Sequence, residues 1–268
     1  MLDEYGVGPG DRSYHIFDSS FAGGDYATNL HKLGARSLAL QDTEWDLSES
    51  IQVLGNKDLG YSDALETVWW SDVIDPNNSD LLLSSPVTTI DTSGSDVIVT
   101  DSHGDLHAAR QVIVTVSIGV LQAEHIDFIP DLPASTVDAY NGIGIDQGMK
   151  VAIRFDSVWW EAEGEPLAWL VTEGLTGACW VPTDYKIGST DHIFMCYPMG
   201  DNAQILSDYA ISGYTDADLN EHFGNDAIVE AILDDLDATL PQAPAKAASN
   251  SFAEAEVQNW GAMGLMRP

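Results

Sequence analysis

The chain has 268 residues, enough for one large domain or two ordinary domains with a sizeable core. Its 43 Asp and Glu residues against 10 Lys and Arg give a formal charge of -33, which repels nucleic acid and anionic membranes. The longest apolar runs fall short of the ~18 residues that span a bilayer, and no signal-peptide pattern opens the chain. We therefore expect a soluble, cytoplasmic or otherwise water-exposed protein that binds neither nucleic acid nor membranes.

The acidic residues are spread along the whole chain and are not gathered in a tail. A surface adapted to salt explains this charge best, because screening weakens the repulsion between hydrated carboxylates. Attraction of cationic ligands such as polyamines is an alternative, although the same screening would weaken it. We expect a salt-rich environment. The two cysteines, Cys179 and Cys196, are too few for a disulfide scaffold, and we favour two buried thiols over one bridge.

The first 60 residues are rich in Gly and Asp and predict loops with short helices. A helix is predicted over 60–70, where Ser62 stands in the place of an N-cap. From residue 80 onward, three β-branched runs predict an antiparallel meander followed by a buried strand. These runs are 80–90, 96–101 and 111–116. The segment 91–96 between the first two predicts an ordinary hairpin turn, because it lacks the spacing of a calcium-binding loop.

The second half of the chain predicts more strands and one long helix. A short helix is expected after Pro133, and four strand-like runs and a closing strand that ends at Trp260 are expected further on. The four runs are 150–155, 166–172, 177–182 and 192–198. The clearest helix is predicted over 215–241, where apolar residues recur at helical spacing. Interspersed strands and helices favour a mixed α/β fold.

The residues alone assign no chemistry. No dinucleotide-binding glycine motif, phosphate-binding loop or zinc-protease motif is present, and Thr115 stands where a nucleophile elbow needs glycine. The seven histidines are scattered singly, so we expect no metal site. Because 43 carboxylates offer too many candidates, acid–base groups cannot be located from composition.

A family signal comes from the order of several segments between about residues 26 and 262. The segments 111–133 and 142–160 resemble the central region of flavin-dependent amine oxidases, which include monoamine oxidases, polyamine oxidases and the histone lysine demethylase. The residues in register are Ser117, Gly119, Val120, Leu121, Phe128, Pro130, Leu132, Pro133, Lys150, Phe155 and Trp160. Weaker likenesses lie at 38–46, 59–68, 81–104 and 257–264.

The resemblance implies FAD as cofactor and gives roles to four residues. Lys150 would hold a water against flavin N5, where hydride leaves the amine carbon, and would stabilise charge on the reduced flavin. Val87 would contact the adenine part through its backbone, and Ser117 lies in the serine-containing turn typical of plant-type polyamine oxidases. Trp260 would line the substrate tunnel, since amines dock well on aromatic faces. The alternative for Lys150 is a solvated lysine at a strand start, and Trp159 and Trp160 are expected to be packing residues.

The resemblance also implies a domain plan. Residues 1–80 would begin a substrate-binding domain with loops and short helices. Residues 81–125 would supply hairpin strands of an FAD-binding domain. Residues 126–268 would complete the substrate domain, with a mixed sheet flanked by helices. The fold class expected is therefore mixed α/β, or α+β.

Two flavin-binding segments of the family have no counterpart here: the glycine loop at a helix N-terminus and a later Gly-Glu segment. The chain thus resembles the middle of an amine oxidase, and we expect that it does not retain FAD by itself. Its expected partners are a small amine substrate and the missing parts of the flavin domain, carried on another chain. A truncated product, a proteolytic remnant and one piece of a split enzyme all stay open.

The expected activity is the flavin-dependent oxidation of an amine, including polyamines, to an imine and aldehyde with release of hydrogen peroxide. One alternative is a non-catalytic fragment that survives as a binding module. Another is a flavin-dependent amino-acid oxidase or desaturase. An amino-acid oxidase needs a cation for the substrate carboxylate, and Arg154 is placed on the same face as Lys150 by strand alternation.

Overall fold

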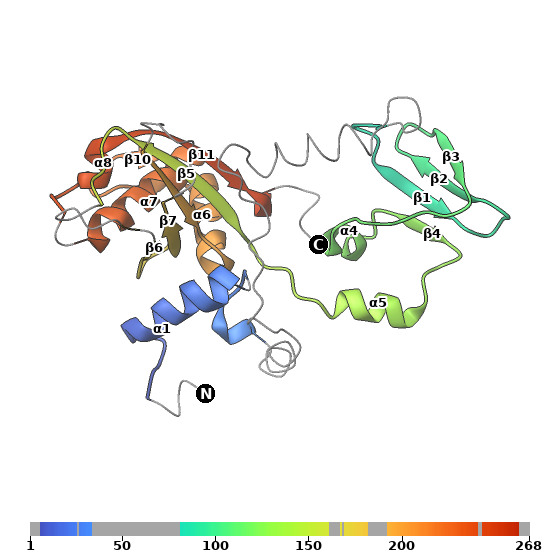
Figure 1. The fold of residues 1–268 in the computed structure, drawn as a ribbon, viewed down its shortest axis with the longest axis horizontal. Coiled ribbons are helices and arrows are strands. Elements are labelled where there is room, and N and C mark those ends of the chain that lie inside the picture. Colours follow the sequence, from blue (N-terminus) through green and yellow to red (C-terminus); the bar gives the residue numbers. More distant parts are fainter. Residues whose placement is uncertain are drawn as a thin grey trace. The chain divides into compact units, whose positions relative to one another are not determined.

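The computed structural model describes residues 6–25, 27–33, 81–160, 167, 169–181, 192–240 and 243–262. The chain divides into two compact units. We call Met1–Val53 with Asp146–Ala262 the five-strand unit, and Leu54–Ile145 with Met263–Pro268 the four-strand unit, after their sheets. Both units contain strands and helices, which confirms the mixed α/β class (Figure 1). The helix predicted over 60–70 and the likeness at 38–46 lie outside the described residues.

The sheet of the five-strand unit has the order β11-β5-β8-β7-β6, and every described pairing in it is antiparallel. Its strands are β5 (Met149–Phe155), β6 (Trp169–Val171), β7 (Ala178–Trp180), β8 (His192–Tyr197) and β11 (Phe252–Asn259). The four predicted strand runs and the closing strand are confirmed. The first and last strands of this series are neighbours, so the C-terminal strand pairs along the full length of β5.

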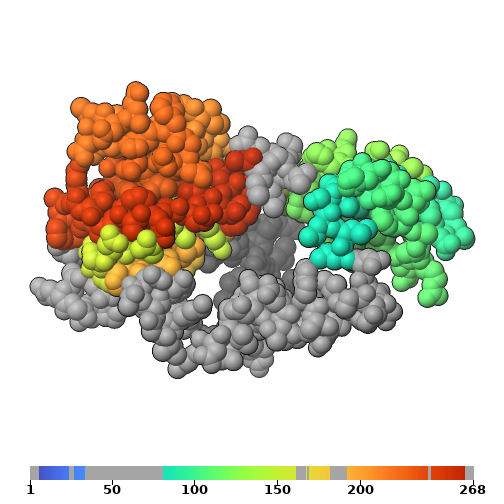
Figure 2. Space-filling model, turned by 90° about the horizontal axis from the view of Figure 1, so that it is seen from above, coloured from blue at the N-terminus to red at the C-terminus, as the bar shows by residue number. Residues whose placement is uncertain are grey.

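Three helices cover one face of this sheet and enclose the main core (Figure 1). They are α6 (Gly200–Ser212), α7 (Asn225–Thr239) and α8 (Ala247–Ser251). Along β5 the burial alternates, and Met149, Val151 and Ile153 point into the core while their neighbours do not. Figure 2 shows the helices in orange on one side of the red and yellow-green atoms of β11 and β5.

Two tryptophans complete this core, as predicted. Trp159 and Trp160 are buried and lie edge-on to Phe155, and both also contact the ring of Phe194. Cys179 and Cys196 are opposite each other on neighbouring strands as free buried thiols. Burial raises the pKa of the Cys179 thiol, which favours the neutral form.

The long helix predicted over 215–241 begins later than expected, which is a correction. Residues 214–222 form a hairpin of β9 (Tyr214–Thr215) and β10 (Glu221–His222), and α7 begins only at Asn225. The carboxylate of Asp216 accepts hydrogen bonds from the backbone N–H of Asp218 and Asn220 at 2.9 Å and 2.8 Å. Such side-chain bonds stabilise a turn at the expense of a helix.

The N-terminal residues of the five-strand unit form short helices, as predicted. They are α1 (Arg12–Phe17), the π-helix η2 (Asp18–Asp25) and the 3-10 helix η3 (Leu30–Lys32). Lys32 links this N-terminal segment to residues after 145 in the same unit by two ion pairs. Its Nζ lies 2.9 Å from Asp146 and 2.8 Å from Asp201. Thr28 donates a further hydrogen bond of 2.6 Å to Asp146.

The four-strand unit contains the predicted antiparallel meander. Its strands are β1 (Val87–Asp91), β2 (Val97–Asp101), β3 (Leu106–Ala109) and β4 (Asp127–Ile129), in the order β3-β2-β1-β4. β4 lies parallel to β1 in this sheet. Two short helices follow β3 and β4, namely α4 (Ile118–Gln122) and α5 (Ala134–Asn141), and the second confirms the helix predicted after Pro133. Because β4 joins β1, residues 126–145 belong to the same unit as 81–125, whereas the predicted boundary lay at 125.

The buried strand predicted over 111–116 is wrong for the described structure. This segment has no strand hydrogen-bonding pattern, and all six residues are exposed, Ile113 to 87%. A β-branched run becomes a buried strand only when neighbouring strands pair with it and cover it. In the described part of the chain, the four-strand sheet has no strand pairing there.

Candidate functional site

Lys150 lies on the face of the five-strand sheet opposite the helices. Alternation along β5 places Lys150, Ala152 and Arg154 together on this face, which confirms the predicted shared face of Lys150 and Arg154. We call it the outer face. The neighbouring strands place Tyr197 of β8 and Gln258 of β11 beside Lys150, through the paired positions Val151–Cys196 and Lys150–Gln258.

The ammonium group of Lys150 lies against two aromatic rings. Its Nζ is 5.3 Å from the centre of the Tyr197 ring and 5.9 Å from the centre of the Trp260 ring, both within the range of cation–π attraction. Trp260 begins the 3-10 helix η6 (Trp260–Ala262) directly after β11, and its backbone N–H donates to the Gly148 carbonyl at 3.2 Å. In the described part of this acidic chain, no carboxylate pairs with Lys150.

The aromatic surface beside Lys150 continues across the sheet. Trp180 lies edge-on to Tyr197 with ring centres 6.3 Å apart, and Trp169 stacks on Trp180 at 5.6 Å. Trp169 stays half exposed, although large aromatic residues usually gain from burial. We call Trp169, Trp180 and Tyr197 the aromatic row. The sequence analysis did not predict this row. One signal was present: Phe194 and Cys196 are the buried positions of β8, so alternation places Tyr197 on the opposite, outer face.

A hollow of about 450 Å³ lies further along the outer face, away from the aromatic row. Its lining includes Ala152, Arg154, Ile193, Glu254 and Glu256. Arg154 Nε lies 2.7 Å from Glu254 Oε1, so this guanidinium already has a carboxylate partner. The hollow is therefore lined by one positive group, Arg154, and its carboxylate partner, Glu254. Glu256, two residues further along β11, adds a second, exposed carboxylate.

Val87 and Ser117, the other two predicted site residues, belong to the four-strand unit. The ladder between β1 and β4 begins only at Thr89, so the β4 side of the Val87 backbone has no strand partner among the described residues. Ser117 is the N-cap of α4, and its hydroxyl oxygen accepts a hydrogen bond from Val120 N–H at 3.4 Å. The structure thus brings Lys150 and Trp260 together, and it describes Val87 and Ser117 within their own unit.

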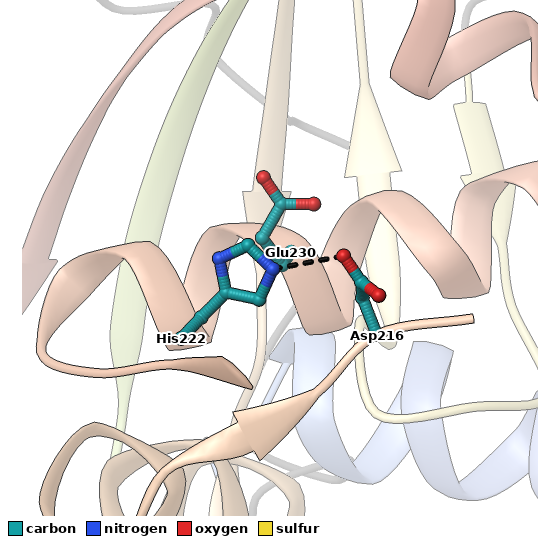
Figure 3. Close-up of side chains that lie close together, drawn as sticks. All are labelled: Asp216, His222 and Glu230. Carbon is teal, nitrogen blue, oxygen red and sulfur yellow. Dashed lines mark hydrogen bonds and ion pairs between the residues drawn. The ribbon is translucent and has the colours of Figure 1, made fainter. Parts of the chain in front are cut away.

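A second group of titratable side chains lies at the β9–β10 hairpin. Asp216, His222 and Glu230 approach one another there, with His222 Nε2 2.8 Å from Asp216 Oδ2 (Figure 3). Hydrogen bonds from Asn220 and His222 lower the pKa of Asp216, and the bond to Asp216 raises the pKa of His222. Burial raises the pKa of Glu230, and nearby carboxylates add to this effect. The sequence analysis expected no such cluster.

Comparison with known proteins identifies the family. The model of the flavin containing amine oxidoreductases matches residues 3–264, nearly the whole chain. The chain belongs to this family of flavin-containing amine oxidoreductases. The resemblance inferred from the order of the sequence segments is thereby confirmed, and oxidoreductase chemistry is established at the level of the family.

Relatives of this amine oxidoreductase family match parts of the chain. The mouse lysine-specific histone demethylase 1B is 32% identical over 154 residues, which cover 56% of this chain and 17% of that protein. A probable polyamine oxidase 4 of Arabidopsis thaliana is 35% identical over 120 residues, 43% of this chain and 22% of that protein. The matches thus span less than a quarter of these relatives.

Solved structures of amine oxidoreductases share the fold. Putrescine oxidase bound to putrescine superposes with a TM-score of 0.54 at 15% identity, covering 71% of this chain and 37% of that chain. An A394C variant of putrescine oxidase gives a TM-score of 0.52 at 15% identity, covering 68% of this chain and 36% of that chain.

Among the described helices, none has the length and apolar character needed to cross a membrane.

Proposed function

We propose that this chain forms the substrate-facing part of an FAD-dependent enzyme that oxidises an amine to an imine, which water hydrolyses to an aldehyde. The observation that carries the proposal is Lys150 on the outer face, between Tyr197 and Trp260 and without a carboxylate partner in the described chain. Family membership supports a flavin reaction at this lysine.

The environment of Lys150 supports this role better than that of an ordinary solvated lysine. In a chain with 43 acidic residues, an exposed lysine has many carboxylates to pair with, and Lys32 and Lys246 both do so. Lys150 instead faces aromatic rings, which attract a cation without neutralising it. Its charge stays available for a group that gains negative charge during a reaction.

The residues of the chain fit a flavin in part. The chemistry that bound FAD supplies is hydride acceptance from the amine carbon, with reoxidation by oxygen and release of hydrogen peroxide. Lys150 would hold a water at its Nζ, the unpaired backbone side of Val87 would meet the adenine part, and the Ser117 hydroxyl would lie close to the cofactor. The phosphate-binding glycine loop would come from a polypeptide segment other than these residues, so we expect weak FAD retention by this chain.

A small amine, including a diamine or polyamine, is the substrate class that we propose. The aromatic row and Trp260 offer ring faces to a cationic or apolar amine chain. Glu256 lines the hollow as an exposed carboxylate on β11 and has no described ion-pair partner, so it could pair with a second ammonium group. The names of the matched polyamine oxidase and of putrescine oxidase support this class.

The contacts of Arg154 support an amino-acid oxidase less well than an amine oxidase. A substrate carboxylate would need an available cation, but Arg154 already lies 2.7 Å from Glu254 and 3.8 Å from Asp156. Recognition of a carboxylate there would require one of these pairs to break. We therefore place amine oxidation first.

The test is Lys150→Met in the flavoenzyme assembled from this chain and the flavin-binding segments. The substitution keeps an apolar stem and removes the ammonium, so amine-dependent flavin reduction or reoxidation should slow at least ~10-fold. Lys246→Met is the matched control, since Lys246 pairs with Asp218 away from the outer face. Stopped-flow absorbance and peroxide release with putrescine and spermine measure the effect. Equal rates for both variants would remove Lys150 from the mechanism, and an assembled enzyme without peroxide release would indicate a non-catalytic module.

A further inference from the structure

The structure points to a binding site for one divalent transition-metal ion of the zinc type, formed by Asp216, His222 and Glu230. The three residues come from two elements: Asp216 and His222 from the β9–β10 hairpin, and Glu230 from α7 (Figure 3). One ligating atom from each residue lies within 4.8 Å of the other two. We propose that a bound ion would join the hairpin to the helix.

The donor set suits such an ion. Zinc and related ions bind imidazole nitrogen and carboxylate oxygen at about 2.0–2.2 Å, so neighbouring ligand atoms lie about 3.4 Å apart in a tetrahedral site. The His222 Nε2 to Asp216 Oδ2 distance of 2.8 Å is slightly shorter, so these two groups need to open by roughly half an ångström. The metal would replace the proton that they share, and water would complete the coordination. The imidazole separates this site from an ordinary acidic patch, because hard ions such as Ca²⁺ prefer oxygen ligands only.

The two hairpin ligands are already oriented. Asp216 Oδ1 accepts the backbone bonds of the turn, which directs Oδ2 toward His222. The side chains of Asp216 and His222 are only 11% and 22% exposed, so much of their water has already been removed. A metal ion gains most from ligands that are held in place before it binds.

The charge around the site also favours a cation. Asp226, Glu230 and Asp234 recur every fourth residue on α7, and like charges at this spacing repel one another. Asp234 accepts bonds from Tyr214 and Ala217 of the hairpin, and Lys246 pairs with Asp218. Glu230 itself has no hydrogen bond or ion pair in the described part of the chain. A divalent ion would give it a partner and reduce the repulsion along the helix.

The experiment is a zinc titration of the full chain after removal of metals with a chelator. Excess Mg²⁺ is kept present to occupy weak carboxylate sites, and calorimetry gives affinity and stoichiometry. One Zn²⁺ per chain is expected. His222→Gln and Glu230→Gln should each weaken binding by at least ~10-fold. Glu221→Gln, which removes the same charge from an exposed neighbour on β10, should change affinity by less than about twofold.

Two further measurements keep the proposal falsifiable. Far-UV circular dichroism checks that each variant folds, and Glu230→Gln breaks no described hydrogen bond, so its loss of binding cannot be assigned to a lost hairpin. Cobalt should give visible absorption bands that disappear in His222→Gln, which reports the imidazole ligand directly. Equal weakening in all three variants, or zinc binding that is displaced by Mg²⁺, would overturn the site and leave Asp216 and His222 as a pair that closes the hairpin.

Discussion

The two units differ in how much apolar surface they bury. In the five-strand unit, large side chains such as Phe155, Phe194 and Ile232 are fully enclosed between the sheet and its helices. In the described residues of the four-strand unit, the buried hydrophobic side chains are Ile90 and Ile126. The same unit exposes long apolar runs. They are Leu81–Leu83 and the segment 112–116.

This contrast shows that the two units are stabilised to different degrees by their own described residues. Burial of apolar area contributes about 25 cal/mol per Å², so the closed core of the five-strand unit can offset much of its chain entropy. The run at 112–116 is exposed and contributes little to this burial. The resemblance predicts that this region belongs to a flavin domain, and this stays a prediction.

Phe194→Ala should show the largest effect on stability. Its ring is 0% exposed and touches both Trp159 and Trp160, so a cavity there should cost about 3–5 kcal/mol of unfolding free energy. Urea unfolding followed by tryptophan fluorescence measures the loss. If this variant fails to fold, Ile153→Val should cost about 0.5–1.5 kcal/mol at the same site.

Ile113→Ala is the matched variant in the four-strand unit. Since Ile113 is 87% exposed, its truncation should change the free energy of unfolding by less than about 0.5 kcal/mol. A cost near that of Phe194→Ala would contradict the contrast between the units and show that 112–116 is buried in solution.

Regular elements with a strong apolar period were predictable from the sequence. The alternation of Val151, Ile153 and Phe155 predicted β5, and Trp159 and Trp160 were expected in the core because tryptophan at a strand end is usually buried. The family resemblance drew attention to Lys150. Its contact with Tyr197 was not predictable, because it depends on which strand pairs with β5.

Two predictions were wrong, the start of the helix at 215 and the buried strand at 111–116. Local polar interactions explain the first, and the lack of a pairing strand among the described residues explains the second. The hairpin at 214–222 replaces the first part of the helix predicted over 215–241, because the Asp216 carboxylate accepts hydrogen bonds from its own turn. The spacing of apolar residues carries no information about such bonds. The run at 111–116 has the composition of a buried strand, yet composition cannot say whether a pairing partner is present. The approach of Glu230 to His222 arises from the packing of α7 on the hairpin, across separate elements.

The units also differ in their ion pairs. Asp146→Asn tests this difference and should reduce stability less than Phe194→Ala does. In the five-strand unit, Asp146 links distant segments through Lys32 and Thr28, whereas Asp101 pairs locally with His103 and His107 in the other unit. Burial acts to raise the pKa of Asp146, but hydrogen bonds from Thr28 and Lys32 outweigh it and lower the pKa. Asp146→Asn should cost about 1–2 kcal/mol at neutral pH.

The sign of the pH dependence follows from this lowered pKa. A carboxyl whose folded pKa lies below the unfolded value of about 3.9 stabilises the protein above that pH, and this stability is lost as pH falls through the folded pKa. Thermal melts of the original protein and the variant should therefore differ at pH 7, and the difference should shrink as pH falls below about 4 and through the lowered pKa of Asp146. Asp138→Asn, on the exposed side of α5, serves as control. A difference that persists unchanged to the lowest pH would refute the charged interaction.

Salt should have a smaller effect than Phe194→Ala or Asp146→Asn, and it should act on both units alike. With -33 charges on 268 residues, folding brings carboxylates together against their repulsion. Raising the ionic strength from 0.1 M to 1 M shortens the screening length from about 10 Å to about 3 Å, which should stabilise the folded chain by about 1 kcal/mol and raise its melting temperature. Calorimetric melts in dilute and molar KCl measure this shift, and repeating them near pH 4 should reduce it, because protonated carboxyls no longer repel. An unchanged or lower melting temperature in molar KCl would mean that the carboxylates are already paired or hold bound ions, and the proposed adaptation to a salt-rich environment would then lose its support.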